Sequence, residues 1–259
     1  MNGRGTKGIL SPAALTLDLD DTLLDLAGLG TAIDETCRAV ASRAPNVRQE
    51  RLRLANALVW ENYWPDVEME WTLGRLPGAD LTREVWRRTL EACGVEERQL
   101  VDLATSAHLG AYGRYIRLYD DARTLLSTVI ALGVPVALIT NGAGDTQREK
   151  LRAVGIEGLF DTIVISGELG VAKPDARPFQ VATDALGVRG RSVWHVGDSL
   201  ASDVAGANSA GLTSVWLNRA GYERQRSIPI PDVEIQSLTE IVEAVDRTED
   251  VSHEPDALG

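Results

Sequence analysis

The stretch LTLDLDDTLLDL, residues 15–26, places four aspartates among aliphatic residues. Its aliphatic beginning predicts a strand buried on both faces, and Asp18 and Asp20 follow where that strand ends. Two residues apart in an extended chain, these carboxylates face the same side. Carboxylates crowded together away from water repel one another, and protonation or a bound cation must relieve the repulsion. The stretch therefore indicates chemistry at a strand end.

Other predicted strands end in polar residues too. Thr140 is the last residue of the aliphatic run VPVALIT, and Asn141 follows it. Asp198 follows the run SVWHVG. In an open parallel sheet, ligands bind outside the carboxyl ends of the strands, so we expect these residues to converge. Ligand sets made only of oxygen suit Mg²⁺ better than zinc. The pattern therefore favours a magnesium site at this edge.

The same residue types are those that phosphoryl transfer requires. An aspartate can attack phosphorus as a covalent nucleophile, and a second carboxylate can handle the proton of the leaving group. The transition state also needs a cation and hydrogen-bond donors near the phosphoryl oxygens. Thr140 offers a hydroxyl, and Asn141 and Gly142 offer backbone N–H groups in a glycine-containing turn. Lys173, in VAKPD, offers positive charge in a later loop.

After Ile116 the chain alternates aliphatic runs with amphipathic segments, which predicts strands joined by single helices. This alternation implies right-handed crossovers and a parallel sheet, an α/β fold of the doubly wound type. The aliphatic run before Asp18 has no local partner and belongs to the same sheet. The predicted strands are 13–19, 134–140, 161–166, 192–197 and 213–218, and the predicted helices are 120–132, 145–154, 175–186, 201–210 and 238–245.

A helical insertion interrupts the pattern, because residues 24–115 show helical spacing and no strand signal. The chain thus divides into a discontinuous core, 1–23 with 116–259, and an inserted all-α domain, 24–115. Both ends of the chain, 1–11 and 247–259, lack hydrophobic periodicity and are expected to be disordered. The helices predicted in the insertion are 31–44, 47–63, 81–93 and 96–115.

Four motifs, taken in order, carry a family resemblance. They are DLDDTL at 18–23, LITNG at 138–142, AKPD at 172–175 and VGDSLASD at 196–203. Together they resemble the haloacid dehalogenase superfamily. The insertion after the first motif resembles the α-helical (C1-type) cap of its phosphatase branch, as in N-acylneuraminate-9-phosphatase-like and phosphoglycolate phosphatase-like members. The resemblance implies a Rossmann-like core with an inserted cap domain.

The resemblance also implies a role for each matching position. Asp18 would be the nucleophile and a Mg²⁺ ligand. Asp20 would be the general acid and base, and its backbone carbonyl would bind the metal. Thr140 would bind the transferring phosphoryl group, and Lys173 would offset the charge on nucleophile and phosphate. The substrate-binding residues would be Thr140, Asn141, Gly142 and Lys173.

The last motif would complete the metal site. Asp198 would be a ligand, and Asp203 would lie near the metal, in contact directly or through water. Asp21 stands where many relatives have glycine, and we expect its side chain to cap the turn. Simpler interpretations stay open for two residues: Asp203 as an acid favoured by a helix dipole, and Lys173 as a surface lysine in a loop.

Some histidine and aromatic side chains are further candidates for the functional site. His195 lies inside SVWHVGD, and we predict a core residue or a support for the site rather than a catalyst. Trp60, Tyr63, Trp64 and Trp71 form a cluster in the insertion. The cluster could close over a substrate, but packing in the core of the insertion is favoured, because large aromatic residues dominate buried contacts.

Composition limits the partners. The net charge of −12 argues against nucleic acid and anionic membranes, and no apolar run reaches the length of a membrane span or a secretory signal. We therefore predict a cytoplasmic protein, a monomer or homodimer, with a small phosphorylated metabolite as partner. Cys37 and Cys93 are too few for a disulfide framework or a cysteine zinc site, and we expect reduced core residues.

These observations favour a Mg²⁺-dependent phosphatase that works through an aspartyl-phosphate. A haloacid dehalogenase would use the same nucleophile on carbon without a metal, but the resemblance associates Asp20 with phosphoryl chemistry. A phosphomutase would have to protect its phosphorylated intermediate from water. A protein that binds without catalysis is disfavoured, because uncompensated acidic residues would only cost stability.

Overall fold

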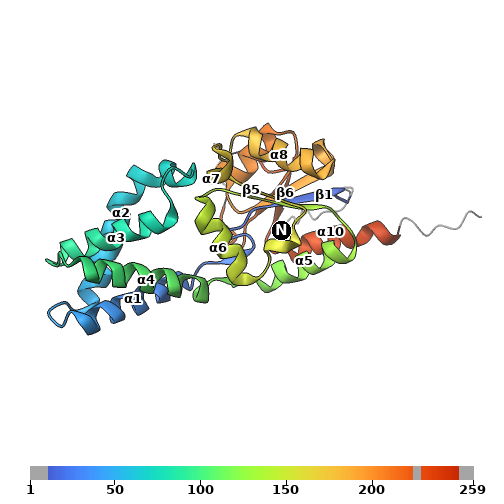
Figure 1. Cartoon of the computed structure of the whole chain (residues 1–259). Helices are drawn as coiled ribbons and strands as arrows, with labels where there is room; N and C mark the ends of the chain where they lie inside the picture. The colour runs from blue at the N-terminus through green and yellow to red at the C-terminus, as the bar shows by residue number, and fades with distance from the viewer. Residues whose placement is uncertain (1–10, 224–228, 251–259) are drawn as a thin grey trace, which may run out of the picture.

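The computed structural model, which describes residues 11–223 and 229–250, has a six-stranded sheet at its centre (Figure 1). The strands lie in the order β5, β4, β1, β6, β7, β8, and all neighbouring strands are parallel. This arrangement confirms the predicted α/β class. The strands are β1 (Ala14–Leu17), β4 (Val136–Thr140), β5 (Thr162–Ile165), β6 (Val193–Gly197), β7 (Thr213–Leu217) and β8 (Val233–Ile235).

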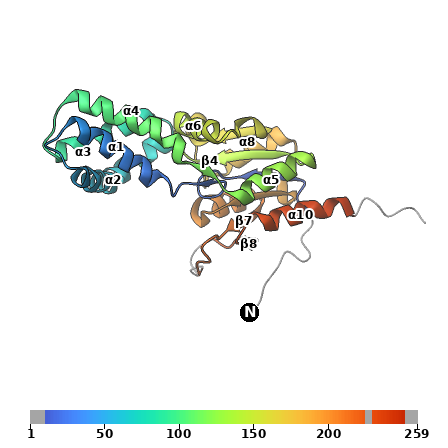
Figure 2. The ribbon, with the colours of Figure 1, turned by 90° about the horizontal axis from the view of Figure 1, so that it is seen from below.

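Helices cover both faces of the sheet because successive strand residues point to opposite sides. Leu15 and Leu17 belong to the apolar cluster under α5, α6 and α10, whereas Ala14 belongs to the cluster under α8 and α9. Figure 1 shows the sheet between these layers, and Figure 2 shows the molecule from the side of α5 and α10. The helices are α5 (Asp120–Ala131), α6 (Gly144–Val154), α7 (Ser166–Leu169), α8 (Ala176–Leu186), α9 (Ala205–Ser209) and α10 (Thr239–Asp250).

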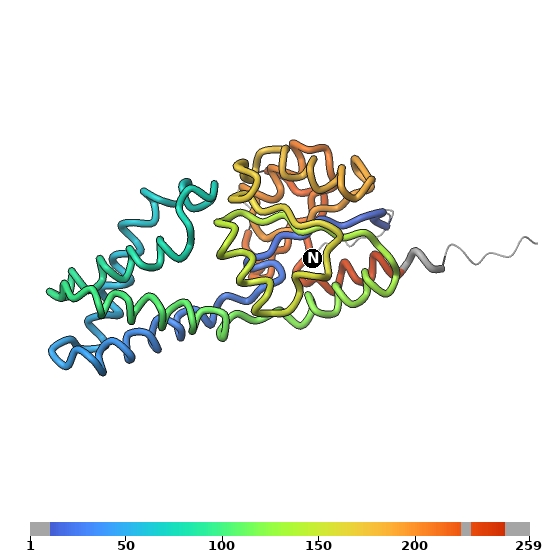
Figure 3. Tube along the Cα trace, in the orientation of Figure 1, coloured from blue at the N-terminus to red at the C-terminus, as the bar shows by residue number. Residues whose placement is uncertain are grey.

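The segment after β1 leaves the core and forms a separate bundle of four helices (Figure 3). The bundle has its own apolar cluster around Cys37, Trp86 and Leu90. Two short strands, β2 (Leu24–Asp25) and β3 (Arg117–Leu118), pair antiparallel where the chain leaves the core and returns to it. The helices are α1 (Leu29–Arg43), α2 (Gln49–Thr72), α3 (Gly78–Ala92) and α4 (Arg98–Tyr115).

Helix ends follow the predictions where a glycine stops the helix. Gly155 and Gly187 end α6 and α8 in the left-handed conformation, with φ of 72° and 70°, which glycine adopts without steric cost. Asp175 caps α8 by accepting a hydrogen bond from the backbone N–H of Arg177 at 2.7 Å. The predicted helix 120–132 corresponds to α5, in which Asp120 lies in the first turn and Tyr119 occupies the capping position.

Three elements extend or differ from their predicted form. α2 continues past the predicted end at 63, through Pro65, to Thr72. The rings of Trp64 and Trp71, one on each side of the proline, meet edge to face. The predicted helix 201–210 begins with a π-helical turn, Leu200–Val204, before α9. α10 continues through Asp250, so 247–250 are helical rather than disordered. β8 was not predicted, because three residues are too few to show a period.

Some of the predictions concern residues that the structure does not describe. Residues 1–10 and 251–259, most of the expected disordered ends, lie outside it. Among the residues that are described, no helix has the length and apolarity needed to cross a membrane.

Candidate active site

Asp18 and Lys173 form the centre of the site, at the carboxyl end of β1. Asp18 is 7% exposed and Lys173 is 5% exposed. The Lys173 ammonium donates to Asp18 Oδ1 at 2.6 Å, to Asp203 Oδ1 at 2.7 Å and to the carbonyl of Ile139 at 2.8 Å. All three donors of the ammonium are thus used. Lys173 is a buried bridge between two carboxylates, not a surface lysine.

Asp203 is held from several sides. Its Oδ2 accepts the backbone N–H of Ser199 at 2.9 Å, and its Oδ1 lies 3.2 Å from His195 Nε2. The other ring nitrogen of His195 lies 2.9 Å from the Thr16 hydroxyl. Burial lowers the pKa of His195, so the pattern fits a neutral ring that donates through Nε2. His195 is a core residue that supports the site, as predicted.

The pKa values in this cluster show how burial and charge compete. Burial opposes ionisation of Asp203, but Lys173 and His195 overcome it and hold the pKa of Asp203 below its usual range. Burial raises the pKa of Asp18, and repulsion from Asp203 and Asp198 adds to the effect, while Lys173 opposes it. Burial also raises the pKa of Asp198 to about 7, with a further contribution from Asp203.

Three of the predicted metal ligands come together. Asp18, Asp198 and Asp203 each offer an oxygen atom, and these atoms lie within 4.8 Å of one another. Asp198 is the most accessible of the three, and its Oδ1 accepts a long hydrogen bond from the Thr22 hydroxyl at 3.5 Å. The carboxylate of Asp20 is not part of this group. The sequence pattern therefore identified all three members of the carboxylate cluster.

Asp20 instead faces α6. Its Oδ2 accepts hydrogen bonds from Lys150 Nζ at 2.6 Å and from Gln147 Nε2 at 3.2 Å. Its Oδ1 is buried and has no partner. Burial works against the charge of Lys150, but Asp20 outweighs it and raises the pKa of the ammonium. Lys150 and Gln147 were missed by sequence reasoning; their spacing of three residues puts them on one face of α6, which was the available signal.

The turn after β4 contains the predicted phosphate-binding residues. The Thr140 hydroxyl accepts from Gln147 Nε2 at 2.6 Å. The Asn141 side chain donates to the Lys173 carbonyl at 3.0 Å and accepts the Lys173 N–H at 2.9 Å, so it fixes the lysine loop. The Gly142 N–H donates to the Ser166 hydroxyl at 2.9 Å. Ser166, at the start of α7, was not anticipated.

Asp21 has the backbone conformation of a glycine. Its φ of 56° is left-handed, a region that aspartate tolerates better than most residues. Its backbone N–H donates to the Leu24 carbonyl at 3.0 Å. The side chain is exposed, and the expected side-chain cap stays a prediction.

Comparison with known proteins identifies the family. The family model described as haloacid dehalogenase-like hydrolase matches residues 12–211, which is most of the chain. The chain belongs to the haloacid dehalogenase-like hydrolases. The resemblance carried by the four motifs is thereby confirmed.

Curated relatives of this hydrolase have phosphatase names. It is 33% identical over 244 residues to phosphoserine phosphatase of Thermus thermophilus, covering 88% of this chain and 96% of the relative. It is 28% identical over 241 residues to N-acylneuraminate-9-phosphatase of Mus musculus, covering 90% of this chain and 94% of the relative. The hydrolase is thus grouped with the phosphatases of its family.

Solved structures extend the likeness across two reaction types. A 2-haloacid dehalogenase from Pseudomonas syringae is 27% identical with a TM-score of 0.64, covering 93% of this chain and 100% of the other. A phosphatase of this family from Thermococcus onnurineus is 25% identical with a TM-score of 0.60, covering 89% and 96%. The fold therefore does not distinguish the two reactions, and the residues of the site have to.

The helical bundle of this hydrolase touches the turn after β4 directly. The Ser166 hydroxyl donates to the Thr72 carbonyl at 2.6 Å, so one side chain joins the end of α2 to the Gly142 amide. The ring of Trp71 lies against Gly142, where a Cβ would be only 2.6 Å from Trp71 Cη2. Only glycine fits at this close approach, which also has a φ of 140°.

A second contact joins the bundle to α6. The Asp145 carboxylate accepts the backbone N–H of Gly78 at 3.0 Å and of Ala79 at 3.2 Å. These N–H groups begin α3 and have no partner within their own helix, so a core residue caps a helix of the bundle. These two contacts therefore join the bundle to the core in addition to the chain crossings.

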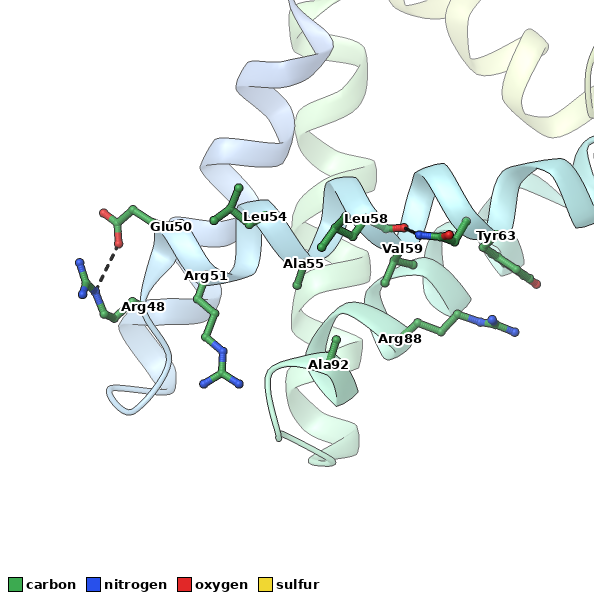
Figure 4. Close-up of a pocket in the computed structure, with 11 residues that line it drawn as sticks. Arg48, Glu50, Arg51, Leu54, Ala55, Leu58, Val59, Tyr63, Arg88 and Ala92 are labelled. Atoms are coloured by element: carbon green, nitrogen blue, oxygen red, sulfur yellow. Dashed lines mark hydrogen bonds and ion pairs between the residues drawn. The ribbon is translucent and has the colours of Figure 1, made fainter.

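The aromatic cluster corrects the expectation of core packing. Trp60, Trp64 and Trp71 are absent from the apolar core of the bundle and line a cavity of about 980 Å³ instead. Tyr63 points elsewhere, with the Arg88 guanidinium 3.9 Å above its ring. It borders a separate hollow on the outer side of α2 and α3 (Figure 4). That hollow contains none of the predicted catalytic residues, so it is not the reaction site.

Proposed function

We propose that this hydrolase is a Mg²⁺-dependent phosphatase that releases phosphate from a small phosphorylated metabolite through an aspartyl-phosphate. The observation that carries the proposal is the group of three carboxylates, Asp18, Asp198 and Asp203, of which only Asp18 and Asp203 pair with an ammonium in the described part of the chain. Displacement at carbon needs one carboxylate as nucleophile. Neither this displacement nor hydrolysis of the resulting ester needs a cation, whereas Asp198 has no basic ion-pair partner among the described residues and is left for a metal to compensate.

The donor set fits Mg²⁺. All three side chains offer oxygen, without nitrogen or sulfur ligands. Three ionised carboxylates and one ammonium leave a charge of −2, which a divalent cation balances. Asp18 and Asp198 would hold the ion together with the Asp20 backbone carbonyl. Both oxygens of Asp203 already accept hydrogen bonds, which favours contact through water. Bound there, Mg²⁺ would neutralise charge on the phosphoryl group.

Asp18 supplies the nucleophile. Lys173 holds Oδ1, and no hydrogen bond within the described residues engages Oδ2. An Asp18 oxygen attacks phosphorus, the bond between phosphorus and the leaving oxygen breaks, and an aspartyl-phosphate forms. Water then attacks the same phosphorus, the bond to Asp18 breaks, and inorganic phosphate leaves.

Asp20 moves the protons in both steps. Lys150 and Gln147 occupy Oδ2, so the unpartnered Oδ1 is the oxygen that carries the proton. In the first step Oδ1 gives this proton to the departing alcohol, and in the second it takes one from the attacking water. Lys150 and Gln147 act as positioning residues, because they fix the orientation of the carboxylate.

The turn after β4 binds the phosphoryl oxygens. The Thr140 hydroxyl and the Asn141 N–H face the developing charge, and Lys173 adds its positive charge next to the nucleophile. The Gly142 N–H is occupied by Ser166 and reaches the phosphate only when that bond is exchanged. In this proposal 24–115 form a cap domain over the core of 1–23 and 116–259, which closes to exclude bulk water.

Metal removal tests the proposal. Phosphate release from p-nitrophenyl phosphate is expected to disappear after dialysis against EDTA and to return with Mg²⁺. Asp198→Asn is expected to raise the Mg²⁺ concentration for half-maximal activity about 10–100-fold, the usual effect of disturbing a metal site. Asp21→Asn removes a neighbouring exposed acid and serves as the matched control. Full activity in EDTA contradicts the metal requirement.

A dehalogenase is the second candidate, because the likeness to a solved 2-haloacid dehalogenase covers that whole chain. The same preparation separates the two reactions. Halide release from 2-chloropropionate that is unaffected by EDTA, with no phosphate release from monoesters, would favour the dehalogenase. The expected result is the reverse.

A further inference from the structure

A cavity of about 980 Å³ lies between the helical bundle and α6. From here on it is called the cap cavity. Its wall is largely apolar and aromatic, formed by α1 to α4 on one side and α6 on the other. The volume falls at the upper end of the usual range for small-molecule sites. The wall residues used below are Trp60, Trp64, Trp71, His108, Tyr112 and Lys150.

Three tryptophans form a row along one wall. Spacings of four and seven residues put Trp60, Trp64 and Trp71 on the same face of α2. Trp60 and Trp64 are stacked, with ring centroids 5.3 Å apart, and Trp64 and Trp71 meet edge to face at 5.4 Å. The row ends at Gly142 in the phosphate-binding turn. Aromatic surface therefore leads from the cap cavity to the turn that binds phosphate.

One residue of the wall of the cap cavity, His108, also has an unused polar atom. His108 Nδ1 is buried and has no hydrogen-bond partner. The ring lies between Trp86 and Tyr112, with centroid distances of 5.9 and 6.0 Å. Burial lowers the pKa of His108 to about 4, so the ring is neutral near pH 7. A buried nitrogen without a partner costs free energy, and a ligand atom that hydrogen-bonds to it would remove that cost.

The basic residues of the wall are already paired. Lys150 binds Asp20 at 2.6 Å, Arg53 binds Asp34 at 3.0 Å and Arg152 binds Glu149 at 3.3 Å. The Arg53 and Arg152 side chains are 66% and 59% exposed and lie at the rim. Among the described residues, the cap cavity therefore has no unpaired cation for a carboxylate of the ligand.

Resting on the proposed phosphatase function, we propose that the cap cavity binds the leaving group of the substrate, and that this group carries a planar aromatic ring and no carboxylate. The ring stacks on Trp60 and Trp64, and a polar atom of a heteroaromatic ring bonds to His108 Nδ1. The substrate is thus a phosphate monoester of an aromatic alcohol or of a nucleoside.

Lys150 places the cap cavity next to the chemistry. Its ammonium contacts Asp20, and its side chain belongs to the wall of the cap cavity. Asp20 protonates the leaving oxygen in the proposed reaction, so the leaving group extends from that oxygen past Lys150 into the cap cavity. Trp71 forms the boundary on the other side, against Gly142.

Matched substrates test the proposal. Uridine 5′-monophosphate has a planar base that ribose 5-phosphate lacks, and 2-phenylethyl phosphate has a phenyl ring that ethyl phosphate lacks. In each pair kcat/KM is expected to be at least about tenfold higher with the ring, since stacking of a base on an aromatic side chain has an effect of this size or larger. Phosphoserine, which has a carboxylate, is expected to rank with the compounds that lack the ring. Equal values within both pairs, or a preference for phosphoserine, overturn the proposal.

Variants locate the preference. Trp60→Leu and Trp64→Leu are expected to bring the ratio within each pair close to one, and the ratio is independent of the amount of folded enzyme. Met69→Ala is the control, because Met69 is 60% exposed on the same helix and outside the cap cavity. His108→Phe separates the two sources of the ring: it is expected to lower kcat/KM for uridine 5′-monophosphate and not for 2-phenylethyl phosphate. A ring preference that survives both tryptophan variants contradicts this location.

A binding measurement separates failure of this proposal from failure of the phosphatase assignment. Asp18→Asn is titrated calorimetrically with uridine 5′-monophosphate and with ribose 5-phosphate. Tighter binding of the nucleotide, abolished by adding Trp64→Leu, supports the aromatic site even if no monoester is hydrolysed. Phosphate release from many monoesters with equal binding of both ligands refutes the aromatic site and leaves the phosphatase assignment intact.

Discussion

The carboxyl edge of the sheet and the cap cavity are both partly buried, but they are built on opposite principles. At the sheet edge, the buried ammonium of Lys173 has buried partners, because it uses all its donors on Asp18, Asp203 and a backbone carbonyl. In the cap cavity, aromatic rings dominate, and His108 Nδ1 has no partner. An unpaired buried charge costs far more than an unpaired imidazole nitrogen, so only the second can be left for a ligand to satisfy.

The comparison implies that chemistry and selection are separate. The sheet edge presents the same acids and the same ammonium whatever the leaving group is. Lys150, through Asp20, and Trp71, through Gly142, connect the cap cavity to that edge. Changes at the edge should therefore affect all substrates alike, and changes in the cap cavity should affect some substrates more than others.

The largest effect is expected from Asp18→Asn. The amide keeps the shape of the side chain but is a poor nucleophile, so kcat should fall at least about 1,000-fold, as for other removed nucleophiles. Phosphate release is the measurement, and it should fall equally for substrates with and without a ring. The fold should persist, because Lys173 keeps Asp203 and the Ile139 carbonyl. Wild-type turnover in this variant would contradict the assigned nucleophile.

Lys173→Met should have the largest effect on stability. It leaves Asp18 and Asp203 buried without their cation, which is expected to lower the free energy of unfolding by about 3–5 kcal/mol. Urea denaturation without divalent cations measures the change. Arg189→Met is the control, because the Arg189–Asp184 pair is equally short, at 2.6 Å, but its arginine is 79% exposed. That pair should contribute less than about 1 kcal/mol. Similar losses in both variants would contradict the contrast between buried and exposed pairs.

Asp145→Ala should have a small effect that is shared by all substrates, although Asp145 borders the cap cavity, because its carboxylate is engaged by the backbone of α3. It removes the acceptor for the first N–H groups of α3, a cap with a typical value of about 1 kcal/mol, and so weakens contact between bundle and core. If closure of the bundle contributes to binding, KM should rise about fivefold for every monoester. Asp66→Ala, at an exposed position of α2, should leave KM unchanged. An effect confined to ring-bearing substrates would mean that Asp145 contacts the leaving group instead.

Sequence patterns predicted most of the sheet for physical reasons. The runs that became β1, β4, β5, β6 and β7 are buried on both faces, and such strands are aliphatic throughout. The acids at their ends were recognisable because a buried carboxylate needs a chemical or electrostatic reason. The short β8 and the pair β2 and β3 have too few residues to show a period.

The parts of the site that were missed depend on tertiary contacts. Lys150 meets Asp20 from 130 positions away, and in the sequence it resembles any charged residue of a surface helix. Ser166 acquires its role only because α7 places it between Gly142 and Thr72. The sequence predicted a cluster of aromatic residues in the insertion but not that three of its tryptophans face a cavity. A helical face against another helix and a face against a cavity have the same pattern.

The short pair β2 and β3 has a consequence for how this architecture can vary. Leu24 pairs with Leu118 and Asp25 with Arg117, so the points where the chain leaves the sheet and rejoins it are hydrogen-bonded neighbours. A segment inserted between β2 and β3 therefore only has to begin and end at neighbouring positions. A helical bundle of another length, or with other residues facing its cavity, can therefore replace this one. The register of the parallel sheet and the carboxylates at its edge would not change.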